Sequence, residues 1–182
     1  SVINTTNGNL NINADQNSYN IVIKNAKVNL SDLSKLSDIP GMEFTGSGKS
    51  KLLQSTLIID TDSNIDKNNT TGDKTYRNMD IGKSGVSINS GVTLSGTEDG
   101  QVGIGQSFNY NDNPQISSSN SGTIDLKGAN SIGIYNKRTQ ISNDGFIEMS
   151  GNNGIGLFTT AGNAYNLGEI KIGNKGIGIY SE

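Results

Sequence analysis

Two acidic side chains recur at one spacing in the C-terminal half of the chain. Asp125 and Glu148 are 148 − 125 = 23 residues apart, and Lys171 follows after another 171 − 148 = 23. Two carboxylates held close together can act as an acid and a base or nucleophile in cleaving glycosidic bonds. Alternating charge on an exposed face is more typical of solvation and weak ion pairing. We favour ion pairing and keep a polysaccharide-acting enzyme as an alternative.

Oxygen-bearing side chains also alternate between residues 62 and 73. Asp62, Asn64 and Asp66 are spaced two apart, and Asp73 is the twelfth residue counted from Asp62. This spacing resembles a calcium-binding EF-hand loop, but Lys67 stands where that loop needs its turn-forming glycine. A weak calcium site is one interpretation, and a solvated polar loop is the other.

The residue types present exclude several classes of chemistry. The 182 residues include no histidine and no cysteine, which excludes a Ser-His-Asp triad and zinc sites built on those side chains. Fourteen basic and 17 acidic residues give a net charge of −3 without a basic run, so we do not expect nucleic-acid binding. We therefore expect a non-enzymatic protein that needs no cofactor other than possible calcium.

The elements that would position these side chains follow from a phrase that is repeated three times. Each copy opens with Asn-x-Gly and closes with an apolar-Gly-apolar-aromatic run. The openings are Asn120-Ser121-Gly122, Asn143-Asp144-Gly145 and Asn166-Leu167-Gly168, and the closures are 132–135, 155–158 and 177–180. A fixed period near 23 residues indicates a repeat architecture.

Within each copy, apolar residues alternate with polar ones, which predicts short strands. Units of this kind cannot close a core alone, but identical units can stack and pair strand on strand in parallel. The predicted fold is an all-β, right-handed parallel β-helix, a solenoid with coils of about 23 residues and inserted loops. Ile124, Ile147 and Ile170 should then stack inside. The asparagines of successive copies could form a ladder of amides.

The pattern divides one continuous domain into two parts. Residues 1–78 are predicted to be irregular early coils with insertions, and residues 79–182 to be regular repeats. The boundary rests on 79–88, which matches 170–179 position for position. Ser31 is predicted to cap a short helix that ends before Pro40-Gly41. Loops at 31–50, 62–78 and 106–119 interrupt the pattern, and insertions in solenoids are frequent binding sites.

Two groups of residues are the candidate binding sites. One is the predicted loop that includes Phe108, Tyr110, Asn111 and Asp112. The other is the set of aromatic residues that closes each copy, Tyr135, Phe158 and Tyr180. Strict alternation places both apolar residues of each closing run inside, as with Ile132 and Ile134, and these rings outside in one column. Such a column could bind a sugar or a protein, or it could only stabilise the coils.

The repeated phrases resemble a known class of bacterial surface protein. The phrases that carry the resemblance are Asn120-Ser-Gly-Thr-Ile, Ser131-Ile-Gly-Ile-Tyr135, Asn143-Asp-Gly-Phe-Ile, Gly154-Ile-Gly-Leu-Phe158 and Gly176-Ile-Gly-Ile-Tyr-Ser181. They are similar to the passenger repeats of large type V (type Va) autotransporter adhesins, particularly fusobacterial ones, over roughly residues 79–182.

The resemblance implies a parent protein with a signal peptide, a long β-helical passenger and a C-terminal outer-membrane barrel that anchors it. Neither the signal nor the barrel is in this sequence. The implied location is the cell surface, outside the outer membrane. The implied function is virulence-related attachment to host cells or other bacteria, through a surface protein or glycan. A passive structural stalk is the alternative, and we expect a monomer.

Overall fold

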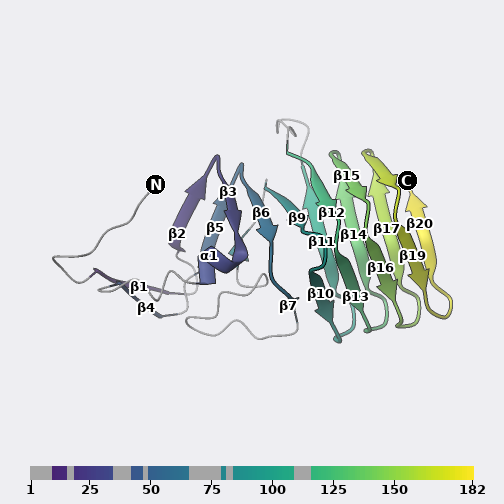
Figure 1. Ribbon diagram of the computed structural model, residues 1–182, viewed down its shortest axis with the longest axis horizontal. Helices are drawn as coiled ribbons and strands as arrows, with labels where there is room; N and C mark the ends of the chain where they lie inside the picture. Colours follow the sequence, from purple (N-terminus) through teal and green to yellow (C-terminus); the bar gives the residue numbers. More distant parts are fainter. Residues whose placement is uncertain are drawn as a thin grey trace.

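The computed structural model describes residues 10–15, 19–34, 42–46, 49–65, 79–80, 84–108 and 116–182. It is an all-β structure in which every strand pairing is parallel. Figure 1 shows β10 to β20 standing side by side, with the chain advancing along the row toward its C-terminus. From β9 onward, successive strands join three different sheets in turn and then return to the first, so each unit contributes one strand to each of these three sheets.

Three sheets run through the C-terminal half. The six-stranded sheet comprises β3 (Lys27–Asn29), β6 (Thr56–Ile59), β9 (Gly85–Ile88), β12 (Ser118–Asn120), β15 (Gln140–Asn143) and β18 (Asn163–Asn166). The five-stranded sheet comprises β7 (Ser63–Asn64), β10 (Thr93–Gly96), β13 (Thr123–Leu126), β16 (Phe146–Met149) and β19 (Glu169–Ile172). The four-stranded sheet comprises β11 (Val102–Ser107), β14 (Ile132–Lys137), β17 (Ile155–Thr160) and β20 (Ile177–Ser181).

Two smaller parallel sheets form the N-terminal part. One pairs β1 (Leu10–Ala14) with β4 (Met42–Gly46), and the other joins β2 (Tyr19–Lys24), β5 (Lys49–Leu53) and β8 (Met79–Asp80). The six-stranded sheet crosses residue 79 without a break, from β6 to β9. The early and late parts of the chain therefore share one sheet.

The predicted internal stack is confirmed. Ile124 pairs with Ile147, which pairs with Ile170, and the first two side chains are completely buried. Asp125, Glu148 and Lys171 pair with one another at the next position of the same strands. Period-two alternation therefore assigned the inner and outer faces of the five-stranded sheet correctly.

The length of the unit changes along the chain, which corrects the prediction of coils near 23 residues. In the six-stranded sheet, Val28 pairs with Leu57 and Leu57 with Val86, so both steps are 29 residues. Ser118 pairs with Ile141 and Ile141 with Ala164, with steps of 23. The prediction holds only for the later units. Strands can stay in register while the connections between them vary in length.

The match between 79–88 and 170–179 does not reflect a shared position in the fold. Strand β8 pairs with β5 and β9 pairs with β6, whereas the matched strands β19 and β20 belong to the five-stranded and four-stranded sheets. This match therefore gives no support to the division of the chain at residue 79, which stays a prediction. Alternation with period two predicts a strand. Strands of all three sheets have this alternation, so it does not show to which sheet a strand belongs.

The predicted asparagine ladder is present. Asn120 donates through Nδ2 to Oδ1 of Asn143 at 2.7 Å, and Asn143 donates in the same way to Asn166 at 2.7 Å. Asn120 and Asn143 are wholly buried. The earlier asparagine of the same phrase, Asn89, is exposed, because Ile88 occupies the position paired with Asn120. The ladder thus begins at Asn120.

The glycines in the apolar-Gly-apolar-aromatic run point toward the core. A Cβ atom added to Gly103 would lie 2.9 Å from Cγ2 of Ile124, and one added to Gly133 would lie 2.7 Å from Cγ2 of Ile147. A real Cβ would therefore collide with the internal stack. We had expected both apolar residues beside the glycine to point inward. In the first two runs only the second is buried, as with Ile134 and Leu157, and the first is half-buried. In the last run Ile179 is 54% exposed.

The short helix α1 (Leu30–Ser34) begins one residue earlier than predicted. Ser31 lies inside it, and its backbone N–H donates to Oδ1 of Asp60 at 3.0 Å. The capping group therefore comes from the next unit and not from Ser31 itself. Residues 35–41, where the helix was expected to end, lie outside the described residues. Within the described ranges, no helix has the length and apolar character needed to cross a membrane.

Candidate functional site

The aromatic residues form the predicted column on the four-stranded sheet. Tyr135 pairs with Phe158 and Phe158 with Tyr180, so the three rings occupy equivalent positions on β14, β17 and β20. Ring centroids lie 5.3 Å and 5.0 Å apart, with interplanar angles of 69° and 78°. This edge-to-face arrangement is favourable for aromatic rings. Tyr180 is 41% exposed, and the other two rings are half-buried.

A second, aliphatic column lies beside the rings. Val102, Ile132, Ile155 and Ile177 pair with one another on successive strands, three positions before the aromatic column. Val102 is 37% exposed and Ile177 is 44% exposed. Strict alternation would place the three isoleucines in the core. The glycine that follows each of them was the available signal. When a strand glycine faces the core, the residue before it faces outward.

The two apolar columns have a polar border. Ser107, Lys137 and Thr160 pair with one another at the ends of β11, β14 and β17, two residues after the aromatic position. Residues two apart in a strand share a face, about 7 Å apart. The outer surface of the four-stranded sheet is therefore aliphatic, aromatic and polar in successive columns.

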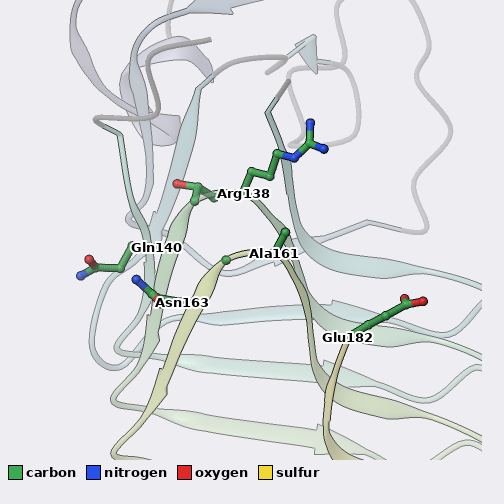
Figure 2. Close-up of a pocket in the computed structure, with 7 residues that line it drawn as sticks. Arg138, Gln140, Ala161, Asn163 and Glu182 are labelled. Atoms are coloured by element: carbon green, nitrogen blue, oxygen red, sulfur yellow. The ribbon is translucent and has the colours of Figure 1, made fainter. Parts of the chain in front are cut away.

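A polar pocket of about 430 Å³ lies at the corner beyond this border. It is lined by Arg138, Thr139, Gln140, Ala161, Gly162, Asn163 and Glu182. Figure 2 shows Arg138 and Glu182 extending to one side and Gln140 and Asn163 to the other. The pocket is thus lined by a guanidinium group, a carboxylate and two side-chain amides, and the charged groups extend to the side opposite the amides (Figure 2).

Buried polar side chains fix the corner. The fully buried Asn136 donates through Nδ2 to the carbonyl oxygen of Thr139 at 3.0 Å and to Oγ1 of Thr159 at 3.2 Å. One unit earlier, Gln106 donates through Nε2 to the carbonyl oxygen of Ile116 at 2.9 Å. The sequence analysis missed these residues. Their recurrence two positions after an inward apolar residue was the available signal.

The predicted binding loop is only partly described. Phe108 is 2% exposed, so its ring offers no surface to a partner, and its assignment to a projecting binding loop is wrong. Its backbone N–H extends the backbone pairing of β11 with β14 by donating to the carbonyl oxygen of Lys137 at 3.1 Å. Tyr110, Asn111 and Asp112 lie outside the described residues.

The calcium prediction is not tested by the residues that are described. Asp62 is exposed and its Oδ1 accepts a hydrogen bond from the backbone N–H of Thr93 at 2.8 Å, while Asn64 lies in β7. Asp66 and Asp73 lie outside the described ranges. Where side chains are described, no three acidic residues gather closely enough to hold a metal ion.

The acidic pair considered for catalysis is engaged in ion pairs. Asp125 lies 3.5 Å from Nζ of Lys127, and Glu148 lies 2.7 Å from Nζ of Lys171. The hydrogen bond from Lys171 to Glu148, and then the charge of that carboxylate, raise the pKa of Lys171 above its ordinary value. This arrangement is typical of charge pairing on an exposed sheet.

Comparison of the chain with protein-family models, with curated proteins and with solved structures found no match. The candidate site therefore rests on the geometry of the four-stranded sheet. Its parts are the aromatic column, the aliphatic column, their polar border and the corner pocket.

Proposed function

We propose that this chain is a segment of a bacterial cell-surface adhesin, and that it attaches to host cells or other bacteria through the outer face of the four-stranded sheet. The observation that carries the proposal is the aromatic column beside the aliphatic column. A regular strand in water normally places polar side chains on its outer face. Apolar columns kept on an outer surface are a common feature of interaction sites.

We further propose that the scaffold is a right-handed parallel β-helix. The support is the cyclic order of the strands, such as β10, β11, β12 and then β13 beside β10. A crossover that returns to a parallel neighbouring strand is right-handed in the great majority of proteins. In such a scaffold, ligand contacts come from exterior columns and inserted loops.

The proposal is tested by measuring attachment of the fluorescently labelled chain to host epithelial cells and to bacterial cells by flow cytometry. The Phe158→Ala variant, which removes the central ring of the aromatic column, should bind weakly. Phe146→Ala is the matched control, because Phe146 is also half-buried but lies on β16 in the five-stranded sheet. Circular dichroism of both variants verifies that the strands remain folded.

Equal binding by wild type and Phe158→Ala would refute the assignment of the site. Absence of binding by the wild type to every cell tested would favour the second candidate function, a passive stalk. That alternative is supported by the edge-to-face packing of the rings, because such packing stabilises the stack without any partner.

A further inference from the structure

Gly105 is a glycine that the fold does not require. It pairs with Tyr135 and so occupies the position of the aromatic column on β11. A positive φ does not explain it, since Gly91 and Gly100 are the described glycines with that conformation. Among the described residues, crowding does not explain it either, because an added Cβ would meet only Cγ1 of Val102, at an ordinary 3.5 Å. By contrast, a Cβ on Gly103 would lie 2.6 Å from the carbonyl oxygen of Gly133.

The missing side chain leaves the end of the aromatic column without a ring on β11, beside Tyr135. Phe158 packs on one side of Tyr135, with centroids 5.3 Å apart, and Gly105 places no side chain on the other. Neighbouring strands lie about 4.8 Å apart, which is close to the spacing of the stacked rings. We call this space the Gly105 gap, and its borders are Val102, Ser107, Tyr135 and Lys137.

The borders of the Gly105 gap combine an apolar floor with polar edges. Val102 is 37% exposed, and Tyr135 offers part of its ring. Ser107, which pairs with Lys137, adds a hydroxyl on the same outer face, and Lys137 adds an ammonium group. A ligand that fits must therefore be a ring with apolar faces and hydrogen-bonding groups around its edge.

We propose that the Gly105 gap binds one saccharide ring of a glycan on the partner surface. The C–H faces of a sugar ring can pack against Tyr135 and Val102, while its hydroxyls reach Ser107 and Lys137. The phenyl ring of a partner protein would fill the same space but would leave those two polar groups without compensation for lost water. This inference rests on the proposed adhesive function and specifies its ligand.

The size of the surface also favours a glycan over a second copy of this chain. Four strands span roughly 14 Å along the stack, and six residues of each strand span roughly 20 Å, giving about 280 Å². A stable protein–protein interface needs about 800 Å² from each partner. The surface is thus too small for a dimer interface, but it is large enough for a short oligosaccharide.

The test is an array of neutral and carboxylated oligosaccharides probed with the labelled chain, followed by titration of any saccharide that binds. Gly105→Tyr should fill the gap and weaken binding by at least about tenfold, because the new ring takes the place of the sugar. Gly105→Ala is the matched control and should bind within about threefold of wild type, since one methyl group leaves most of the gap open. The melting temperature of Gly105→Tyr should be no lower than that of wild type.

The outcomes separate this inference from the proposed function. Saccharide binding that is lost in Gly105→Tyr and kept in Gly105→Ala would support it. Wild-type binding that Gly105→Tyr leaves unchanged would overturn the location, and no saccharide binding by wild type would overturn the ligand class. Cell attachment and saccharide binding that both survive in Gly105→Tyr would preserve the adhesive function while refuting the gap. Absence of wild-type cell attachment would instead refute the function on which the inference rests.

Discussion

Replacing Asn143 by alanine tests whether the buried amide ladder stabilises the stack. Asn143 is wholly buried, accepts from Asn120 at 2.7 Å and donates to Asn166 at 2.7 Å. The substitution removes both bonds, each with a net value of about 1 kcal/mol. It also leaves the buried Nδ2 of Asn120 with only the carbonyl oxygen of Phe146 at 3.3 Å, whereas the exposed Asn166 can bind water.

The expected cost is therefore about 2–4 kcal/mol, and the upper value applies if the buried amide of Asn120 finds no new partner. Urea denaturation followed by circular dichroism measures it. With a slope of about 2 kcal/mol per molar urea, the midpoint should fall by roughly 1–2 M. A loss of this size is a large fraction of the stability of a typical domain.

Asn89→Ala is the matched control for the ladder. Asn89 opens the same Asn-x-Gly phrase but is exposed, since Ile88 takes the ladder position. Its replacement should cost less than about 0.5 kcal/mol. Equal midpoints for Asn89→Ala and Asn143→Ala would refute the reasoning, because the phrase and not the buried hydrogen bonds would then matter.

Three further predictions concern the core and the outer face. Ile147→Asp should cost several kcal/mol in urea denaturation, because it buries a carboxylate without a partner, whereas Glu148→Ala should have a much smaller effect; equal effects would mean that the strand register is wrong. Gly133→Ala should lower the midpoint strongly, because its Cβ would lie 2.7 Å from Cγ2 of Ile147, and an unchanged midpoint would show that the core can yield there. Because the pKa of Lys171 is raised, its ion pair stabilises the fold below the ordinary lysine pKa, and this contribution is lost as pH rises through the higher folded pKa. NMR titration should show the pKa of Lys171 falling in Glu148→Gln. An unchanged pKa would exclude Glu148 as the cause.

The sequence predicted the regular units well because their inner positions must be apolar in every copy. The stack of Ile124, Ile147 and Ile170, the asparagine ladder and the aromatic column were all accessible from a constant 23-residue spacing. Before residue 118 the unit length differs from 23 residues, with a step of 29 from Leu57 to Val86 and of 32 from Ser87 to Ser119, so the 23-residue spacing is lost there. Pattern alone then could not assign strands to faces.

The candidate site was harder to predict than the scaffold. Ile132 was assigned to the core because strict alternation places both isoleucines around Gly133 on one side. In the structure, Gly133 and Ile134 both face inward, so the alternation is interrupted and Ile132 lies outside. Phe108 was assigned to the surface because it borders an insertion, but it is buried. The large apolar ring was the one sign of burial in the sequence. The burial of Ile132 and Phe108 depends on contacts between neighbouring units, which the sequence of one unit does not predict.

The amide ladder also couples the folding of each unit to that of its neighbours. Each of its hydrogen bonds runs from Nδ2 of one unit to Oδ1 of the next, and each spans 23 residues. The entropy lost in closing a loop of this length is the same at every step. A folded unit can therefore act as a template for its successor, and order can propagate along the axis one unit at a time. Under denaturing stress, we expect the end units, which have a neighbour on one side only, to fray before the central stack unfolds.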